Sequence, residues 1–435
     1  MTPKTFKIKS FGCQMNVYDG ERMAELLGAQ GMTAAAETAD ADLVVLNTCH
    51  IREKAAEKAY SDVGRLRRED GSKPLVALAG CVAQAEGAEA KRRSSLIDIV
   101  VGPQAYHRLP EMVAQASRGG RPVDTDMPAI SKFDAFPARR RANSSAFLTV
   151  QEGCDKFCTY CVVPYTRGAE ISRPWGDIVA EAQELVDAGA REIVLLGQNV
   201  NAWSDGNRGL AELIRHLATI DGLERIRYTT SHPADMTDAL IAAHGEVEKL
   251  MPYLHLPVQS GSNRILKAMN RSHTADTYLA TLGKMRTARP DIALSGDFIV
   301  GFPGETEADF EATLQIVDEV RYASAYTFKY SPRPGTPAAN MEDQIPVAIM
   351  EERLQRLNER INTHRLAFNR STVGVETQVL IERPGKLPGQ MIGRSPWLQS
   401  VHVETAAHPG DIVDVTLVAA GPNSMTGAAR ARAAA

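Results

Sequence analysis

Short apolar runs alternate with helical stretches along most of this 435-residue chain. Within residues 1–120, strand-like runs lie at positions 7–11, 43–46, 75–79 and 97–101, with helical stretches at 20–30 and 52–68. Short apolar runs separated by helices are typical of parallel strands that are buried on both faces. We therefore expect residues 1–120 to form an N-terminal parallel α/β sheet domain.

The same alternation returns after residue 145 and then gives way to β structure. Six strand candidates lie at 147–150, 192–196, 225–230, 253–257, 293–300 and 325–330. Six βα units suggest a partial (β/α)6 barrel over residues 146–371 rather than a complete eightfold barrel. Residues 121–145 show no periodicity and are expected to be a linker. Residues 372–435 contain strand-like runs between Pro-Gly pairs, which predicts a small all-β barrel with a mobile tail from 427. The expected fold class is α/β multidomain.

Composition and charge exclude several classes of protein. The hydrophobic fraction of 44% and the charged fraction of 23% are ordinary for a globular chain. No stretch approaches the roughly 18 uncharged apolar residues of a spanning helix, and the first residues lack the apolar segment of a secretory leader. We expect a cytoplasmic protein with no membrane partner. The net charge of -4 gives no whole-chain argument for nucleic-acid binding.

Three of the six cysteines directly follow the first predicted barrel strand, and they are Cys154, Cys158 and Cys161. A C-x3-C-x2-C loop of this kind can hold three corners of a 4Fe–4S cube and leave one iron open for a chelating ligand. A zinc loop with a histidine as fourth ligand and a set of structural cysteines are the alternatives. No histidine lies within the loop, which favours the cluster.

The other three cysteines are far apart in sequence, but each follows a predicted strand. Cys13, Cys49 and Cys81 are the last residues of the segments KIKSFGC, LVVLNTC and LVALAGC, respectively. Since parallel strands end at the same edge of a sheet, we expect the three thiols to converge there on a second cluster with an open iron. Three independent buried cysteines and a cysteine nucleophile are the alternatives, although a nucleophile needs only one thiol.

The C-x3-C-x2-C loop after the first barrel strand resembles the radical S-adenosylmethionine (SAM) superfamily. The resemblance implies that SAM chelates the open iron and is cleaved to a 5′-deoxyadenosyl radical. It also implies which residues contact SAM. The adenine would lie beside Tyr160 and against a packing motif that contains Ile299 and Gly301. Gln198 and Asn199 would lie near the amino and carboxylate groups of SAM, and Gln259 and Ser260 near its ribose. Ordinary strand-end polarity or packing explains each position about equally well.

The pair of three-cysteine sets resembles the methylthiotransferase family over nearly the whole chain. The matching words include FGCQMNVYDGERM, QEGCDKFCTYCVVPYTRGAEISRP, HLPVQSGSNRILKAMNR and SGDFIVGFPGETEADF. The family resemblance implies two 4Fe–4S clusters and two molecules of SAM, one that methylates a sulfur and one that supplies the radical. CVVPYTRG resembles the branch that adds a methylthio group at C2 of N6-isopentenyladenosine, beside the anticodon of tRNA. Gly20 stands where the family usually has serine, a departure expected to be harmless.

The C-terminal β-barrel resembles a TRAM domain, a small RNA-binding module. Its word GRSPWLQS departs from the usual form of that module, and the region is not strongly basic. RNA binding would then depend on Arg394 and on stacking against the indole of Trp397. The alternative for Trp397 is a core aromatic residue. The arginines at 139–141 and at 353, 356 and 360 are further basic groups, although such runs are usually solvated surfaces.

Two sister activities of the family stay open as alternatives, one on an aspartate of a ribosomal protein and one on threonylcarbamoyladenosine in tRNA. A non-catalytic iron–sulfur RNA-binding protein is an alternative from another class, but it predicts four protein ligands at each cluster. The resemblance to the methylthiotransferase family implies a tRNA substrate, a reducing electron donor such as flavodoxin or ferredoxin, and a sulfur source. Without an obvious coiled coil, we expect a monomer.

Overall fold

The computed structural model describes residues 3–50, 53–67, 71–127, 132–139 and 142–430. The chain divides into two compact units. The first comprises residues 1–139, 152–155 and 161–171, and the second comprises residues 140–151, 156–160 and 172–435. Among the described residues, every helix is too short or too polar to cross a membrane.

The first unit is built on a six-stranded parallel sheet with the strand order β2-β1-β3-β4-β5-β6. The strands are β1 (Thr5–Phe11), β2 (Thr33–Ala34), β3 (Leu43–Thr48), β4 (Leu75–Gly80), β5 (Ile99–Val101) and β6 (Val123–Asp124). Four of them correspond to the predicted runs. The N-terminal parallel α/β sheet domain is therefore confirmed.

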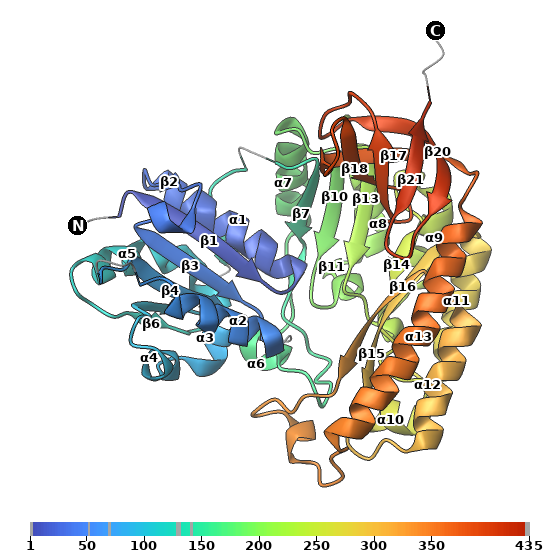
Figure 1. The fold of residues 1–435 in the computed structure, drawn as a ribbon, viewed down its shortest axis with the longest axis horizontal. Coiled ribbons are helices and arrows are strands. Elements are labelled where there is room, and N and C mark those ends of the chain that lie inside the picture. Colours follow the sequence, from blue (N-terminus) through green and yellow to red (C-terminus); the bar gives the residue numbers. More distant parts are fainter. Residues whose placement is uncertain (1–2, 51–52, 68–70, 128–131, 140–141, 431–435) are drawn as a thin grey trace. The chain divides into compact units, whose positions relative to one another are not determined.

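Both faces of this sheet are covered by helices (Figure 1). On β3, Val44 and Leu46 pack into one hydrophobic core, whereas Leu43 and Val45 pack into another on the opposite face. The helices are α1 (Gln14–Ala29), η1 (Thr38–Asp40), α2 (Glu53–Gly64), α3 (Cys81–Glu86), α4 (Glu89–Arg93), η2 (Pro103–Arg108), α5 (Leu109–Ser117), η3 (Lys132–Ala135) and α6 (Val163–Arg167). This double cover explains why the strand sequences are continuously apolar.

The segment predicted to be a linker contributes to the first unit. Val123–Asp124 form the edge strand β6, which sequence periodicity could not reveal because it is only two residues long. Lys132 and Arg139 are both buried. Arg139 pairs with Glu21 at 3.0 Å and with Glu25 at 3.1 Å, so at least this member of the arginine run is not a solvated charge. Residues 140 and 141 lie outside the described residues.

The second unit contains the six predicted barrel strands as two parallel three-stranded sheets, β13-β10-β7 and β14-β15-β16. Ile226 connects the sheets, because its N–H donates to Lys249 O at 2.7 Å and its carbonyl accepts from Met251 N–H at 3.0 Å. The strands are β7 (Ser145–Thr149), β10 (Glu192–Leu196), β13 (Arg225–Thr229), β14 (Tyr253–His255), β15 (Ala293–Val300) and β16 (Ser324–Lys329). Their carboxyl ends carry the candidate SAM residues.

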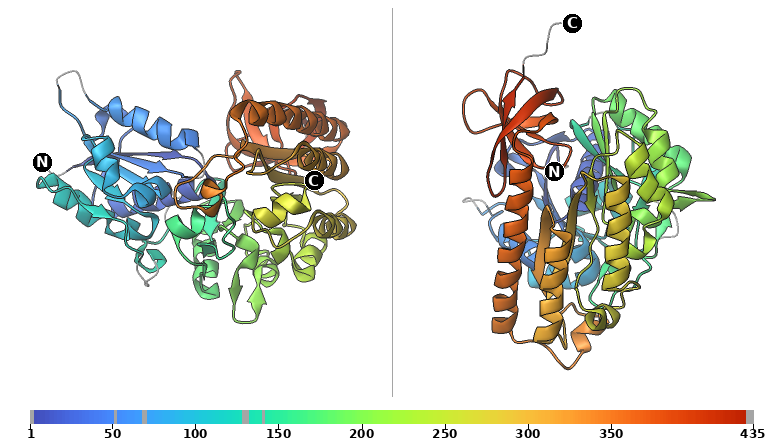
Figure 2. Two further views of the ribbon diagram at one scale, coloured as in Figure 1. Left: turned by 90° about the horizontal axis from the view of Figure 1, so that it is seen from below. Right: turned by 90° about the vertical axis from the view of Figure 1, so that its right-hand side faces the viewer.

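Helices alternate with these strands, as Figures 1 and 2 show. They are α7 (Trp175–Asp187), η4 (Val200–Ala202), α8 (Leu210–Leu217), η5 (Pro233–Asp235), α9 (Asp238–Glu246), α10 (Asn263–Ala268), α11 (Ala275–Ala288), α12 (Glu307–Val320), η6 (Pro337–Asn340) and α13 (Val347–Ser371). The short strands β8 (Gln151–Glu152), β9 (Ile171–Ser172), β11 (Ser204–Asp205) and β12 (Arg208–Gly209) complete the chain before the C-terminal barrel. Helix α13 packs on β16 and α12, and it leads into that barrel.

Residues 376–429 form a closed barrel with the strand order β17-β18-β19-β21-β20. Strands β19 and β21 pair in parallel, and the other neighbouring strands pair antiparallel. Its strands are β17 (Glu376–Pro384), β18 (Gln390–Arg394), β19 (Ser400–Glu404), β20 (Ile412–Ala420) and β21 (Met425–Ala429). The expected small all-β barrel is therefore confirmed. The prediction of a mobile tail from residue 427 is wrong at its start, because residues 427–429 belong to β21, which pairs with both β19 and β20.

Two buried arginines on β13 hold the loop of residues 394–397 against the six-strand array. Arg225 donates to Arg394 O at 2.8 Å and to Gln378 O at 2.9 Å. Arg227 donates to Pro396 O at 2.8 Å and Ser395 O at 3.0 Å, while its Nε donates to Glu192 at 2.8 Å. Since buried carbonyls need donors, these bonds fix the C-terminal barrel on the six-strand array within the second unit.

We expect Arg227→Met to destabilise the protein by about 3 kcal/mol, because it leaves the buried Glu192 carboxylate without its ion-pair partner. Limited proteolysis should then release the C-terminal barrel at a lower temperature than in the unaltered protein. Arg215→Met is the matched control, since Arg215 pairs with Glu246 at 2.8 Å on the surface. Equal protease resistance of the two variants would contradict this anchoring role.

Candidate metal centres and cofactor site

The register of the first sheet brings three cysteines to one edge. Phe11 pairs with Thr48, and Thr48 pairs with Gly80, so β1, β3 and β4 end level with one another. Cys49 and Cys81 are the next residues of their strands, and Cys13 follows one residue later. The N–H of Cys49 donates to Phe11 O at 3.0 Å, which continues the ladder up to the cysteine. The predicted convergence of these three strand ends is confirmed.

Two glycines let the backbone approach closely at this edge. A Cβ atom on Gly12 would lie 2.2 Å from the Cβ of Cys49, and Gly12 has a φ of +130°. A Cβ on Gly80, at φ +93°, would lie 2.3 Å from Thr48 O. Only glycine adopts such positive φ values readily and leaves this space empty. Both glycines directly precede a cysteine of the set.

The three thiols differ in their electrostatic environments. A hydrogen bond with Cys49 lowers the pKa of Cys13 to about 6, burial opposes this shift, and the charge of Arg167 reinforces it. The Cys13 thiol also donates to Asn16 Oδ1 at 3.0 Å. Burial raises the pKa of Cys81, while the positive charge of Arg167 acts in the opposite direction. Iron–sulfur clusters are held by thiolates, so this donor set fits one.

A buried network of four charges lies in the same unit. Arg167 donates to Glu152 at 2.7 Å and to Asp19 at 2.6 Å, and Lys132 donates to Glu152 at 2.9 Å and approaches Asp19 at 3.5 Å. All four side chains are at most 2% exposed. Burial alone would raise the pKa of Glu152, but Lys132 and Arg167 hold it below its ordinary value. The network contains equal numbers of positive and negative groups.

The C-x3-C-x2-C loop follows β8, and its described contacts fall in both units. In the first unit, Cys154 N–H donates to Gly168 O at 3.3 Å, and Val163 N–H donates to the Cys161 sulfur at 3.5 Å. In the second, Arg271 donates to the Cys158 sulfur at 3.6 Å. The loop is pinned to the end of α10, where Asn270 donates to Phe157 O at 3.0 Å. Within each unit, the part of the loop that belongs to it is therefore held by hydrogen bonds.

The structure brings together the residues predicted to pack against the adenine. Tyr160 and Ile299 contact the same small hydrophobic cluster, which also contains Met350. A Cβ on Gly301 would lie 2.1 Å from Met350 Cγ, and Gly301 has a φ of +72°. The end of β15 is therefore tightly packed at Gly301, which accounts for the absence of a side chain there.

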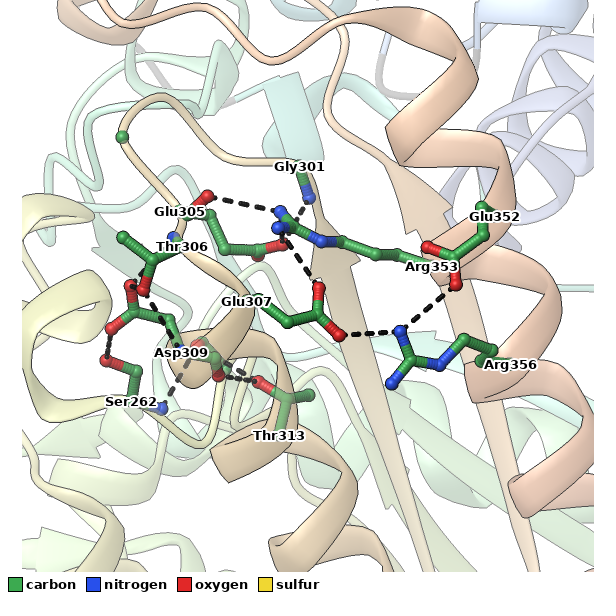
Figure 3. A network of polar contacts seen from close by, with 12 residues as sticks. Ser262, Gly301, Glu305, Thr306, Glu307, Asp309, Thr313, Glu352, Arg353 and Arg356 are labelled. Atoms are coloured by element: carbon green, nitrogen blue, oxygen red, sulfur yellow. Dashed lines mark hydrogen bonds and ion pairs between the residues drawn. The ribbon is translucent and has the colours of Figure 1, made fainter.

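A polar network fixes the loop after β15 (Figure 3). Gly301 N–H donates to Glu305 at 3.0 Å, and Arg353 of α13 donates to the same carboxylate at 2.8 Å. Asp309 accepts from Ser262 and from Thr306, both at 2.5 Å. These bonds connect α10, α12 and α13 around the strand end that carries Ile299 and Gly301.

The predicted polar SAM residues lie at the ends of β10 and β14, but several of their groups already have protein partners. Gln198 N–H and Asn199 N–H donate to Gln151 at 2.8 and 3.0 Å. The Asn199 amide donates to Asp235 at 2.8 Å. Gln259 adopts a left-handed φ of +79°, and Ser260 lies 3.3 Å from the Thr313 hydroxyl. The role of these four residues in binding SAM stays a prediction.

Three buried polar atoms at the ends of β10 and β13 have no hydrogen-bond partner among the described residues. They are Asn199 Oδ1, Ser231 Oγ and His232 Nε2. Burial, and next the charge of Arg271, lowers the pKa of His232 to about 2, so its imidazole is neutral. Buried polar groups are normally paired. This part of the second unit therefore fits a polar ligand such as SAM or its substrate.

Both residues predicted to bind RNA have packing partners in the second unit. The indole N–H of Trp397 donates to Asp291 O at 2.9 Å, and its ring packs against the core of the C-terminal barrel. Arg394 donates to Glu382 at 3.3 Å. Three arginines of α13 also form ion pairs: Arg353 with Glu305, Arg356 with Glu307, and Arg360 with Asp318. A role in RNA binding stays a prediction for Arg394 and Trp397.

Sequence reasoning missed the charged residues around the cysteines. Arg167 lies in the word CVVPYTRG and could have been suspected from its place just after Cys161. Arg271 ends the word KAMNR, which carried no chemical signal. Lys132 lies in a stretch without periodicity, and its burial depends on partners that are distant in sequence.

Among the described residues, no three His, Cys, Asp or Glu side chains are arranged to hold a single metal ion.

Comparison with known proteins assigns the chain to a family. Residues 5–102 match the model of the uncharacterized protein family UPF0004, and residues 148–317 match that of the radical SAM superfamily. A tRNA-2-methylthio-N(6)-dimethylallyladenosine synthase from Novosphingobium aromaticivorans is 69% identical over 431 residues, which cover 98% of this chain and 97% of that protein. The chain belongs to the family of tRNA-2-methylthio-N(6)-dimethylallyladenosine synthases. The methylthiotransferase resemblance of the sequence is therefore confirmed.

Other members of this synthase family match over the same length. The proteins of this name from Zymomonas mobilis and Cereibacter sphaeroides are 68% and 60% identical, and the matches cover 98% and 97% of this chain and 96% and 97% of those proteins. Among solved structures, the radical SAM methyltransferase TsrM from Kitasatospora setae has a TM-score of 0.56 at 13% identity, covering 77% of this chain and 75% of that chain. The cobalamin-dependent SAM radical enzyme OxsB has a TM-score of 0.53 at 12% identity, covering 83% and 56%. Both solved structures share the fold of this chain over the regions that match.

We expect Gly12→Ala to disrupt the first cysteine set alone, because the new methyl group would collide with Cys49. Iron in the anaerobically reconstituted protein should fall from about eight to about four atoms per chain. Gly31→Ala is the matched control, since Gly31 also has a positive φ, of +82°, but faces open space. Full iron content in the Gly12 variant, or equal loss in both variants, would contradict the assignment of these thiols.

Proposed function

We propose that this chain installs a methylthio group at C2 of N6-dimethylallyladenosine, beside the anticodon of tRNA. It is a radical SAM methylthiotransferase that uses SAM and 4Fe–4S chemistry, as its family membership implies. The observation that carries the proposal is the convergence of Cys13, Cys49 and Cys81 at one sheet edge, in a chain that also has a C-x3-C-x2-C loop. A radical enzyme with only one cluster has no use for the second thiol set.

In this proposal Cys154, Cys158 and Cys161 hold the radical SAM cluster, and Cys13, Cys49 and Cys81 hold an auxiliary cluster. When bound, these groups supply a 5′-deoxyadenosyl radical and a sulfur that SAM can methylate. The aromatic C2–H is not acidic enough for a general base, which is why the reaction needs a cofactor for its difficult step. The protein contributes binding, orientation and a dry environment.

The described side chains suggest how the second unit binds SAM and the substrate base. Tyr160 and Ile299 offer an apolar surface for an adenine ring. Asn199 Oδ1 offers an acceptor, and the Ser231 hydroxyl can donate or accept. His232 Nε2 offers a donor, because its Nδ1 accepts the Ala234 N–H at 3.2 Å and the neutral ring carries its one proton on Nε2. Because the His232 imidazole is neutral, it can bind a base edge without placing a charge beside the ligand. The positions support recognition of a nucleoside between an apolar wall and a polar one.

The proposed activity requires partners besides the tRNA substrate. One is a reducing electron donor, such as flavodoxin or ferredoxin, because radical formation consumes an electron. Another is a sulfur source, because each product carries a new sulfur atom. We also propose a cytoplasmic location, where tRNA modification takes place, and a monomeric state.

We expect Cys49→Ala to separate the two proposed clusters in function. The variant should still cleave SAM to 5′-deoxyadenosine, because the C-x3-C-x2-C loop is intact, but it should form no methylthio product on tRNA. Both products can be quantified by mass spectrometry after incubation with reductant and tRNA that carries dimethylallyladenosine. Ala79→Gly is a control at the same sheet edge that leaves all thiols in place. A normal yield of methylthio nucleoside from Cys49→Ala would remove the first cysteine set from the mechanism.

Trp397 can bind RNA only in addition to its packing role. If a base stacks on the indole, Trp397→Ala should weaken tRNA binding by about 1–3 kcal/mol, while Trp397→Phe, which can still stack, should lose little. Both variants lose the N–H that donates to Asp291 O, so both should have a lower melting temperature. Affinity is measured at fixed salt, since salt changes phosphate contacts. A lowered melting temperature with unchanged affinity in both variants would show that Trp397 only packs.

A further inference from the structure

Asp235 joins the C-x3-C-x2-C loop to the end of β10 within the second unit. The ammonium of Lys156 lies 2.8 Å from both carboxylate oxygens of Asp235, and the side-chain amide of Asn199 donates to Oδ2 of the same carboxylate at 2.8 Å. Lys156 lies two residues before Cys158, and Asn270 donates to its carbonyl at 3.2 Å. One carboxylate thus accepts from the cluster loop and from the strand end predicted to bind the amino and carboxylate groups of SAM.

The carboxylate of Asp235 fixes which way the Asn199 amide points. A carboxylate can only accept hydrogen bonds, so the amide must turn its Nδ2 toward Asp235 and its Oδ1 away. Asn199 is 1% exposed, and its Oδ1 has no hydrogen-bond partner in the part of the chain that the structure describes. The backbone N–H of Asn199 donates to Gln151 at 3.0 Å, which holds the residue in place. Because buried acceptors are normally paired, this oxygen is suited to a ligand that donates.

Lys156 determines why the residue at position 235 must be an aspartate. Its ammonium can only donate, so position 235 must keep an acceptor toward Lys156. The two oxygens of a carboxylate accept from Lys156 and from Asn199 at once. The side-chain amide of an asparagine has only one oxygen, and its other end is an NH2 donor. The orientation of the Asn199 amide therefore depends on the carboxylate and on its pairing with Lys156.

We propose that Asp235 is a positioning residue that holds Asn199 Oδ1 toward the amino group of SAM, from which it accepts a hydrogen bond. The inference rests on the SAM site of the proposed function and deepens it. SAM carries donors at its amino group, its ribose and its adenine, and the apolar surface of Tyr160 and Ile299 suits the adenine. Asn199 instead shares Asp235 with the cluster loop, whose open iron takes the amino and carboxylate groups in the proposed function. The amino group is thus the donor that fits.

The test measures SAM affinity by equilibrium dialysis with the full-length, anaerobically reconstituted protein, whose clusters are kept oxidised and whose iron content is determined in parallel. In Asp235→Asn, Lys156 takes the single side-chain oxygen, so the NH2 group of the new amide faces Asn199 and reverses the Asn199 amide. A donor then faces the amino group of SAM, and we expect the dissociation constant to rise at least about tenfold. Adding Lys156→Met to Asp235→Asn should restore most of the affinity, because the oxygen at position 235 can then turn toward Asn199.

Restoration by a second substitution distinguishes orientation from damage, because a loosened site would be weakened further. Asp238→Asn is the matched control, since Asp238 pairs with Lys284 at 2.8 Å on the surface of the same unit. Its affinity for SAM should match that of the unaltered protein. Asn199→Ala should weaken binding as Asp235→Asn does, and combining the two should add no further loss.

Unchanged affinity in Asp235→Asn or in Asn199→Ala, at full iron content, would overturn the inference. So would a variant with both Asp235→Asn and Lys156→Met that binds SAM no better than Asp235→Asn alone. If Asp235→Asn holds less iron than the unaltered protein, the affinity of Asn199→Ala decides. An unaltered protein that holds its iron but does not bind SAM would instead overturn the SAM site of the proposed function.

Discussion

Parallel pairing of β1, β3 and β4 is the constraint on which the first cysteine set depends. The three strands end level because Phe11, Thr48 and Gly80 are in register, and each strand is followed within two residues by a cysteine. A slip of one residue would turn every side chain of a strand to the other face. The two separate cores on the faces of the sheet oppose such a slip, since Val44 and Val45 are buried on opposite sides. The packing of the sheet thereby fixes the position of the thiols.

The sequence predicted the parts of this architecture that depend on local pattern. Apolar runs identified all six strands of the second unit's parallel sheets, and the position of a cysteine after each of three runs predicted their convergence. The prediction failed where long-range contacts decide. Strand β21 has the weakly apolar sequence MTGAA and forms because β19 and β20 provide partners on both sides. Lys132 was assigned to a linker because its partners, Asp19 and Glu152, lie far away in sequence.

Arginine roles could not be read from composition. Basic residues suggested RNA contacts along α13, yet Arg353 is buried against Glu305, and Arg356 pairs with Glu307. Arg225 and Arg227 belong to the predicted strand 225–230, and they hold the 394–397 loop by its carbonyl groups. That loop contains the departure GRSPWLQS, which is consistent with a sequence adapted to packing. Buried guanidinium groups thus organise both compact units.

The measurement that tests the central claim most directly is nucleoside analysis of tRNA from cells that lack this protein. We predict that 2-methylthio-N6-dimethylallyladenosine disappears, that N6-dimethylallyladenosine accumulates in its place, and that the intact gene restores the methylthio nucleoside. The Cys81→Ala form should not restore it, because one thiol of the converging set is missing. An unchanged level of the methylthio nucleoside in the deletion strain would contradict the assigned activity. Restoration by Cys81→Ala would contradict the role of the sheet edge.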